Sequence, residues 1–191
     1  MIKHLHGSTG IAGIVYYTAA HFPKRYRDTV FIGNPVTGRV NRDHFDVHGS
    51  TYEADEEPDF ISCDDPWFRP VDLQLGPDGA LYIADFYNRI IGHYEVPLDH
   101  PGRDRFRGRI WRMVYTGNDD DAQPLQELSN LTQFSTEELI ATLDNPNLAQ
   151  STMATHELVD RVGEAAIEPV TEIVRNGSAQ QRAHGMWVLF R

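Results

Sequence analysis

The segment that most constrains the fold runs from Phe68 to Arg89 and reads FRPVDLQLGPDGALYIADFYNR. Apolar and polar residues alternate from Val71 to Leu75, which is the period-two pattern of a half-buried β-strand. The GPDG tetrapeptide at 76–79 then supplies a tight turn, and a second alternating stretch ends at Asp85. The segment therefore predicts one hairpin of an antiparallel sheet. Because a hairpin alone is marginally stable in water, further strands must complete the sheet.

Further strands are expected on both sides of this hairpin. Alternation between apolar and polar residues is typical of three stretches before it and one stretch after it. Part of the acidic segment from Ser50 to Asp65 is expected to pair as an outer strand around Phe60 and Ile61. The four predicted strands are Ile11–Tyr17, Thr29–Gly33, Arg39–Val47 and Arg109–Tyr115.

In the last third of the chain, apolar residues recur with the 3.6-residue period of α-helices. Ser135 with Glu138, and Ser178 with Gln181, are capping boxes that each predict a helix start. Two more helices are expected between them, from about Leu148 to Val162 and from Ala165 to Arg175. A self-similarity at an offset of 30 residues relates Ile140 to Val170 and Leu158 to Val188. Paired helices with such a period are typical of a HEAT-like α-solenoid.

Composition excludes several classes of function. The net charge of −11 argues against general binding to nucleic acid or to anionic membranes, since both need a positive surface. No stretch approaches the ~20 apolar residues of a membrane span, and we expect no signal peptide in this chain. Cys63 is the single cysteine, so neither an internal disulfide nor a Cys-x-x-Cys-His haem attachment site is expected.

The pattern GPDGxLY(I/V)xD at 76–85 resembles a blade of a six-bladed propeller of the soluble sugar-dehydrogenase and NHL kind. Extended through ADFYNRIIGHY at 84–94 to RIWR at 109–112, it resembles the membrane-bound dehydrogenases of planctomycete-type bacteria. In that family a propeller is followed by HEAT-like repeats and a c-type cytochrome domain. The resemblance implies a β + α multidomain chain. Its parts are the last one to two blades of an antiparallel β-propeller (1–116), a linker (117–134) and truncated HEAT-like helical pairs (135–191).

The same resemblance implies a function. It points to a fragment of a sugar or alcohol dehydrogenase of the quinoprotein type, which passes electrons to a cytochrome module outside this chain. Pyrroloquinoline quinone and calcium are the cofactors that it implies, with haem c only in the cytochrome module. The expected partners are a carbohydrate or alcohol substrate and the missing propeller blades. The implied location is periplasmic or otherwise extracytoplasmic, and the isolated chain is expected to be inactive, because a quinone site needs loops from several blades.

The long connection from Phe86 to Gly108 is the best candidate for a site, since loops beyond ~12–15 residues are usually functional or disordered. Asp85 and His93 are its candidate catalytic residues, because a carboxylate and an imidazole can together deprotonate a sugar hydroxyl. The alternative is that Asp85 and Asn88 cap a turn and that the histidines are solvated. No recognised metal spacing is present. The candidate cofactor-binding residues are Tyr87, Asn88, Arg89 and Arg103.

Arginines recur in near alternation at the end of this connection. They can bind a carboxylated quinone, a phosphate or an acidic patch of a partner, or pair internally with the acidic run from Glu53 to Asp65. Internal pairing is favoured because acidic residues are in excess. For the acidic run itself, a solvated outer strand is favoured over calcium binding, since the EF-hand pattern is missing. The arginines are Arg103, Arg105, Arg107, Arg109 and Arg112.

A rival hypothesis of a different class is a non-enzymatic scaffold of propeller and HEAT elements that binds a glycan or a protein. Here the long connection would grip the ligand and the helices would dock a partner. Fold alone does not decide between the two hypotheses. An enzyme should depend on a cofactor, whereas a scaffold should bind its ligand without one.

Overall fold

The structure is a computed structural model that describes residues 6–8, 10–92 and 95–191. It divides into two compact units, and each is described by itself. The first unit holds Met1–Tyr17, Phe22–Gly76 and Ala80–Ala122, and the second holds Thr18–His21, Pro77–Gly79 and Gln123–Arg191.

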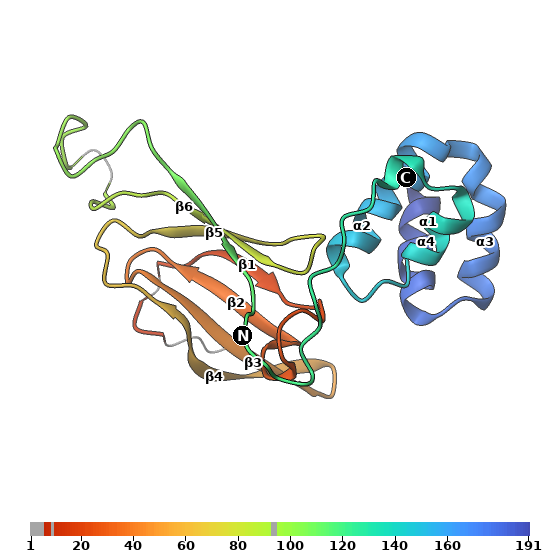
Figure 1. Cartoon of the computed structure of the whole chain (residues 1–191), viewed down its shortest axis with the longest axis horizontal. Coiled ribbons are helices and arrows are strands. Elements are labelled where there is room, and N and C mark those ends of the chain that lie inside the picture. Colours follow the sequence, from red (N-terminus) through yellow and green to blue (C-terminus); the bar gives the residue numbers. More distant parts are fainter. Residues whose placement is uncertain (1–5, 9, 93–94) are drawn as a thin grey trace. The chain divides into compact units, whose positions relative to one another are not determined.

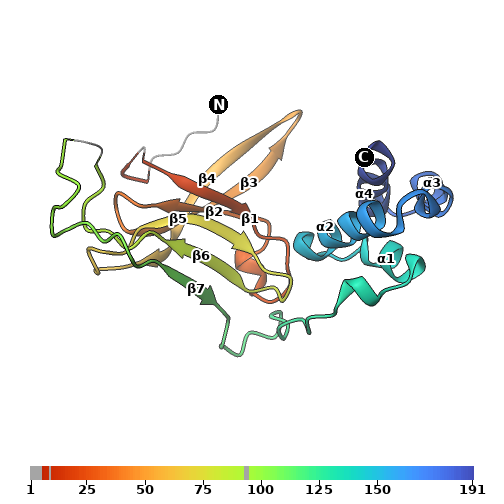
Figure 2. The same cartoon turned by 90° about the horizontal axis from the view of Figure 1, so that it is seen from above.

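A four-stranded antiparallel sheet occupies the first part of the first unit (Figure 1). Its strands lie in chain order, and β3 and β4 extend past the other two as a two-stranded ribbon (Figure 2). The predicted strands in this region are confirmed. The acidic run is also confirmed as an outer strand, since β4 pairs only with β3 among the described residues. The bounds are β1 (Ala12–Tyr16), β2 (Thr29–Asn34), β3 (Arg39–His48) and β4 (Thr51–Ser62).

A second antiparallel sheet in the same unit contains the predicted hairpin, which is confirmed. It has three strands, β5 (Pro70–Leu75), β6 (Leu81–Asp85) and β7 (Arg109–Met113), with β6 in the middle. The turn closes through the Gly76 amide, which donates to the Ala80 carbonyl at 2.8 Å. Leu73 and Ile83 are register partners and are fully buried, as the alternation requires.

Aromatic packing forms much of the core of the first unit. The rings of Tyr17 and Phe22 stack with centroids 4.6 Å apart, and those of Phe31 and Phe60 lie 4.5 Å apart. Tyr17 and Phe31 are fully buried, and each large ring removes much apolar surface from water. This cluster joins the end of β1 to β2 and β4.

The two sheets approach one another closely at glycines of the four-stranded sheet. A β-carbon on Gly13 would lie 2.5 Å from the Asp72 Cα, and one on Gly33 would lie 2.6 Å from the Pro70 carbonyl oxygen. Gly13 also has a φ of 65°, a conformation that favours glycine. Main chain of β1 and β2 therefore meets main chain of β5 with no side chain between them.

The second unit is a small helical cluster. Both predicted capping boxes are confirmed. The Ser135 and Ser178 hydroxyls accept from the Glu138 and Gln181 amides, and the serine amides donate to the side-chain oxygens of the same two residues. A π-helical turn, Leu158–Val162, extends the second helix. No helix in the described ranges is long and apolar enough to cross a bilayer. The helices are α1 (Thr136–Thr142), α2 (Leu148–Glu157), α3 (Ile167–Asn176) and α4 (Ala179–Phe190).

The predicted fold class, propeller blades followed by a HEAT-like solenoid, is wrong. Among the residues that the structure describes, the sheets have four and three strands and neither closes, and the helices surround one shared core, so the chain is a small β + α protein. The residues matched at the offset of 30, such as Leu158 and Val188, lie together in that core. The pattern recurs because both helix pairs face the same apolar centre. Local alternation and capping specify elements, whereas closure and stacking depend on long-range contacts.

Candidate functional site

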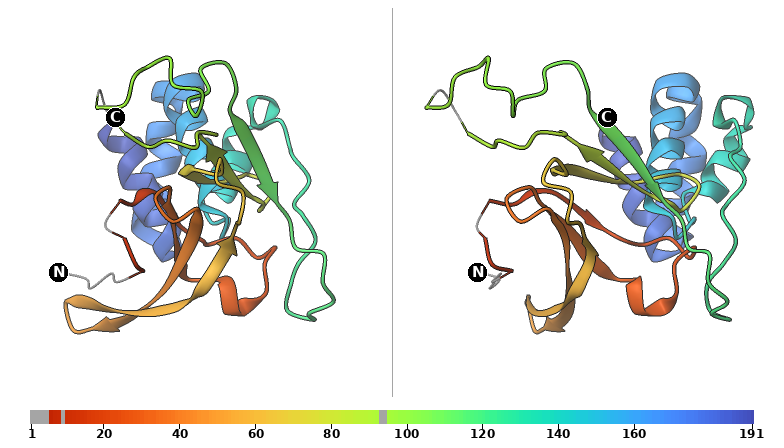
Figure 3. Two further views of the ribbon diagram at one scale, coloured as in Figure 1. Left: turned by 90° about the vertical axis from the view of Figure 1, so that its left-hand side faces the viewer. Right: turned by 60° about the vertical axis from the view of Figure 1, so that its left-hand side comes forward.

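The connection 86–108 leaves the end of β6 and returns at the start of β7, and it extends beyond both strands (Figures 1 and 3). A depression of about 340 Å³ lies along its second half. The lining is mixed, with aromatic, cationic and anionic side chains. Its polar and aromatic members are Trp67, Asp99, His100, Arg103, Asp104, Arg105, Phe106 and Arg107.

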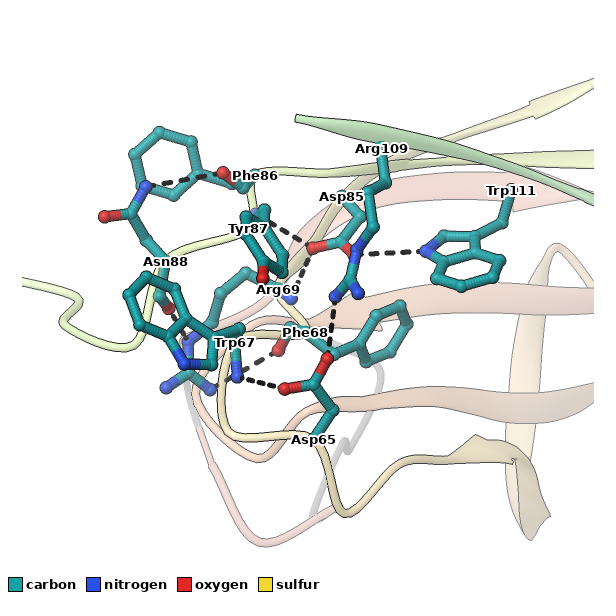
Figure 4. Close-up of polar contacts among 10 residues, drawn as sticks. All are labelled: Asp65, Trp67, Phe68, Arg69, Asp85, Phe86, Tyr87, Asn88, Arg109 and Trp111. Atoms are coloured by element: carbon teal, nitrogen blue, oxygen red, sulfur yellow. Dashed lines mark hydrogen bonds and ion pairs between the residues drawn. The ribbon is translucent and has the colours of Figure 1, made fainter. Parts of the chain in front are cut away.

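Asp85 forms the base of this connection, at the end of the central strand of its sheet (Figure 4). Its Oδ1 accepts from the amides of Arg69 at 2.8 Å and Tyr87 at 2.9 Å. Its Oδ2 accepts from Arg109 Nε at 2.6 Å and from Trp111 Nε1 at 3.1 Å. The residue is only 3% exposed, so both carboxylate oxygens are engaged by protein donors inside the fold.

These donors decide the ionisation of Asp85. Burial raises the pKa of Asp85, but the hydrogen bonds from Arg69, Trp111, Tyr87 and Arg109 lower it further, so the pKa lies below its ordinary value of 3.8. The carboxylate is therefore ionised at neutral pH and saturated as an acceptor. It could take a substrate proton only by giving up one of these bonds, so the geometry gives it a positioning role.

Arg109 links this base to the segment before β5. Its guanidinium bridges Asp85 and Asp65, with NH2 3.1 Å from Asp65 Oδ2. Burial lowers the pKa of Arg109, but the two carboxylates outweigh burial and raise it. Asp65 in turn accepts from the Trp67 amide at 2.9 Å. Internal pairing of the arginine stripe with the acidic run is thus confirmed for this one residue.

An aromatic stack packs against the Asp85–Arg109 ion pair. The Tyr87 ring stacks on Trp67 with centroids 5.2 Å apart, and the Arg109 guanidinium lies 4.2 Å from the Tyr87 centroid (Figure 4). Tyr87 has a φ of 51°, which is uncommon for a residue with a side chain. Trp67 is half-buried and lines the depression, so one face of the site is held by the stack.

Asn88 and Arg103 hold the two halves of the connection together. The Asn88 Oδ1 accepts from the Asp104 amide at 3.0 Å, while its Nδ2 donates to the Asp104 carbonyl at 3.1 Å. Arg103 NH2 donates to the carbonyls of Gly92 and Val96, each at 3.1 Å. These side chains therefore order the connection from within.

The structure brings some of the predicted site residues together and leaves others apart. Asp85, Tyr87 and Asn88 meet at the base, in line with the alternative that Asp85 and Asn88 cap turns. Arg103 lines the depression, Arg89 is exposed, and His93 lies outside the described residues. Sequence reasoning missed three contributors that flank the hairpin or lie in the connection, and the tryptophan beside a run of aspartates in DDPWFRP was the available signal. They are Trp67, Arg69 and Phe106.

The rim of the depression differs from its base. Phe106 is 94% exposed, and Arg105 is exposed and makes no hydrogen bond or ion pair with any residue the structure describes. Arg107 pairs with Asp104 at 2.6 Å on the surface. Hydrogen bonds from the Phe106 amide and Arg107 outweigh desolvation and lower the pKa of Asp104. Three arginines against two aspartates leave the lining with an excess positive charge.

Two of the four residues predicted to hold a quinone are engaged within the connection. The amide of Asn88 and the guanidinium of Arg103 are engaged with the backbone of the connection itself. Within the described ranges, no group of three or more His, Cys, Asp or Glu side chains could hold a metal ion. Pyrroloquinoline quinone and calcium remain predictions of the family resemblance alone.

The comparisons with known proteins assign the chain to a family. The family model described as a domain of unknown function, DUF7133, matches residues 1–117. No curated protein and no solved structure matches the chain. Because the family match covers more than half of the 191 residues, the chain belongs to the DUF7133 family.

Proposed function

We propose that the chain is a non-enzymatic binding module whose depression along 98–107 takes an acidic carbohydrate. The observation that carries the proposal is an exposed guanidinium, Arg105, beside two aromatic rings, Phe106 and Trp67, in one depression of about 340 Å³. The rings supply apolar faces on which the C–H face of a sugar ring can pack. The guanidinium supplies paired donors that match a carboxylate.

The rigidity of the base supports this function. Trp67 is held by the Tyr87 stack and by Asp65, so it loses little conformational freedom when a ligand arrives. Preorganised contacts of this kind bind more tightly than mobile ones, because the ordering cost is already met in the free protein.

Charge distribution also favours a sparsely charged anion. The whole chain carries a net charge of −11, whereas the lining of the depression has one more arginine than aspartates. A local positive site on an acidic surface attracts a ligand with isolated carboxylates, while the remaining surface repels a polyanion such as nucleic acid. A uronic acid oligomer, with one carboxylate on each sugar ring, has this chemistry.

The dehydrogenase function implied by the sequence resemblance is the competing proposal. Its base would be Asp85, and both oxygens of that carboxylate accept hydrogen bonds from protein donors. A base with occupied oxygens is poorly placed for proton abstraction. The geometry therefore favours binding over catalysis.

The test is calorimetric titration of the full chain with tetragalacturonate, and with cellotetraose as the uncharged control. We expect tetragalacturonate to bind more tightly, and Arg105→Ala to weaken it about tenfold, the usual effect of losing a charge-assisted bond. Arg112→Ala, which removes an exposed arginine of β7 outside the depression, is the matched control.

Three results would overturn the proposal. The first is no heat with tetragalacturonate, and the second is equal weakening by Arg105→Ala and Arg112→Ala. The third is sugar-dependent reduction of an artificial electron acceptor by the chain with pyrroloquinoline quinone and calcium. That last result would establish the dehydrogenase instead.

A further inference from the structure

The helix α4 of the second unit is apolar on two opposite faces. Its inner face packs in the helical core, where Val188 is 8% exposed and a β-carbon on Gly185 would lie 2.9 Å from the Val174 side chain of α3. Its outer face also carries large apolar side chains, and these are open to solvent. A helix with apolar residues all round is normally buried, so the outer face is expected to have a partner.

The outer face forms one stripe along the helix. Four of its residues recur at intervals of four, three and four positions, which places them on one side of a helix with 3.6 residues per turn. Its large members, Met186, Trp187 and Phe190, are 59%, 62% and 82% exposed, and its two alanines are exposed as well. The α4 stripe consists of Ala179, Ala183, Met186, Trp187 and Phe190.

The exposed apolar area is large enough to form an interface. Trp187 and Phe190 hold each other in an edge-to-face contact with ring centroids 6.1 Å apart, so both rings are ordered on the surface. With ~150–250 Å² for a large aromatic side chain, these rings together with Met186 and Leu189 expose roughly 500 Å². Two copies of the stripe would therefore bury about 1,000 Å², the lower limit for a specific interface.

We propose that the chain forms a homodimer in which α4 packs antiparallel against α4 of a second copy. A two-fold axis that passes between positions 184 and 185 places Ala183 opposite the partner's Met186. The same axis places Ala179 opposite the partner's Phe190. Each large side chain then meets a small one, which lets the two helices approach closely, and the contact is closed because both copies use the same stripe.

Charge favours a second copy over other occupants. The whole chain carries a net charge of −11, yet α4 contains neither Asp nor Glu, so two copies can meet here without repulsion between carboxylates. An anionic membrane is disfavoured, because α3 of the same unit exposes Glu168 and Glu172. An acidic partner helix would gain one ion pair at most from α4, since Arg182 is its single arginine and it has no lysine.

The test is sedimentation equilibrium of the full chain over a series of concentrations. We expect the mass to rise from that of one chain to that of two. Phe190→Ala and Met186→Ala should each weaken the dimer about tenfold, because each removes a large side chain from the centre of the contact. Met153→Ala, which removes an exposed methionine of α2, is the matched control and should leave the dimer unchanged.

A reciprocal exchange tests the antiparallel arrangement. Ala183→Met places two methionines opposite one another, and Met186→Ala leaves two alanines opposite one another, so each change should weaken the dimer. The double variant again places one methionine opposite one alanine at both symmetric contacts. Its dissociation constant should return to within about threefold of the wild-type value, because the two positions are coupled. Both residues favour helices, so α4 should persist in all three variants.

The proposal is overturned if the chain stays monomeric up to about 1 mM, or if the dimer is unaffected by Phe190→Ala. A double variant that dimerises no better than Ala183→Met also overturns it. A monomer that binds phosphatidylglycerol vesicles, and loses this binding in Trp187→Ala, would assign the stripe to a membrane instead. None of these measurements involves the depression along 98–107, so they are independent of the acidic-carbohydrate proposal.

Discussion

The base and the rim of the connection 86–108 use the same kinds of side chain in opposite ways. At the base, Asp85 and Arg109 are paired with one another and with neighbouring groups, and the carboxylate is buried. At the rim, Arg105 has no hydrogen bond or ion pair to a described residue, and Phe106 is almost fully exposed. Charged groups that are fully engaged build a support, and charged groups left on the surface can recognise a ligand.

This difference teaches that residue type alone does not identify a site. Both ends of the connection contain arginine, aspartate and an aromatic ring, yet Asp85 is buried at the base whereas Arg105 and Phe106 are exposed at the rim. If the division of roles is correct, substitutions at the base should change stability and substitutions at the rim should change binding. The following predictions test that separation.

The largest effect is expected at Asp85. Asp85→Ala removes the acceptor for four donors and leaves Arg109 without a main partner, so the free energy of unfolding should fall by about 3 kcal/mol or more. Urea unfolding measures this change. Asp72→Ala, at an exposed position of β5, should change it by no more than about 0.5 kcal/mol. If Asp85→Ala does not fold, Asp85→Asn can replace it, with a smaller expected loss of stability. Equal losses of stability for the Asp72 and Asp85 variants would contradict the supporting role of the base.

A smaller loss of stability is expected at Asn88. Asn88→Ala removes a buried side chain and leaves the amide and carbonyl of Asp104 without that partner, which costs about 1–3 kcal/mol. Asn118→Ala, at an exposed position, is the control and should have little effect. Urea unfolding measures both. Identical unfolding curves for the two variants would show that Asn88 does not support the connection.

The loss of stability at acidic pH tests the supporting role of the Asp85 carboxylate. Because its folded-state pKa is lowered, its contribution to stability is present above the ordinary value of 3.8 and is lost as pH falls through the folded-state pKa. Urea unfolding below pH 3.8 should therefore show a steeper loss for the wild type than for Asp85→Asn. The same pH dependence of stability in the wild type and in Asp85→Asn would mean that the hydrogen-bond donors do not stabilise the ionised carboxylate.

The smallest effect on stability is expected at the rim. Phe106→Ala should change the free energy of unfolding by less than about 0.5 kcal/mol, since the ring is 94% exposed. The same variant should weaken tetragalacturonate binding about fivefold, because it removes one aromatic face. Unfolding and calorimetric titration of one preparation measure both properties. A loss of stability as large as that at Asn88 would place Phe106 in the support instead.

The sequence predicts the local elements well. Period-two alternation and the GPDG turn specify the hairpin of β5 and β6, and the serines at 135 and 178 specify two helix starts, because each signal depends on neighbours within a few residues. The site is less predictable. The sequence around Asp85 is the same whether its carboxylate acts as a catalytic base or stabilises the fold. Only the hydrogen bonds from Arg69, Arg109 and Trp111, which the sequence does not reveal, distinguish the two roles.

The pairing of His6 with Asp43 illustrates the same limit. The two residues are far apart in the chain, and neither belongs to a motif with a fixed spacing. Sheet registers and packing of the segment before β1 bring them together, and long-range register is not encoded in any short window. The wrong fold class has this origin too, since blade-like hairpins do not determine whether a sheet closes.

The contact between the sheets at Gly13 and Gly33 has a mechanical consequence. Side chains between two layers can change rotamer and absorb a small displacement, but main-chain atoms in van der Waals contact cannot. A shift of β5 against Gly13 would therefore be passed directly to β1, without a soft layer in between. Any larger residue at Gly13 or Gly33 would act as a wedge that separates the two sheets.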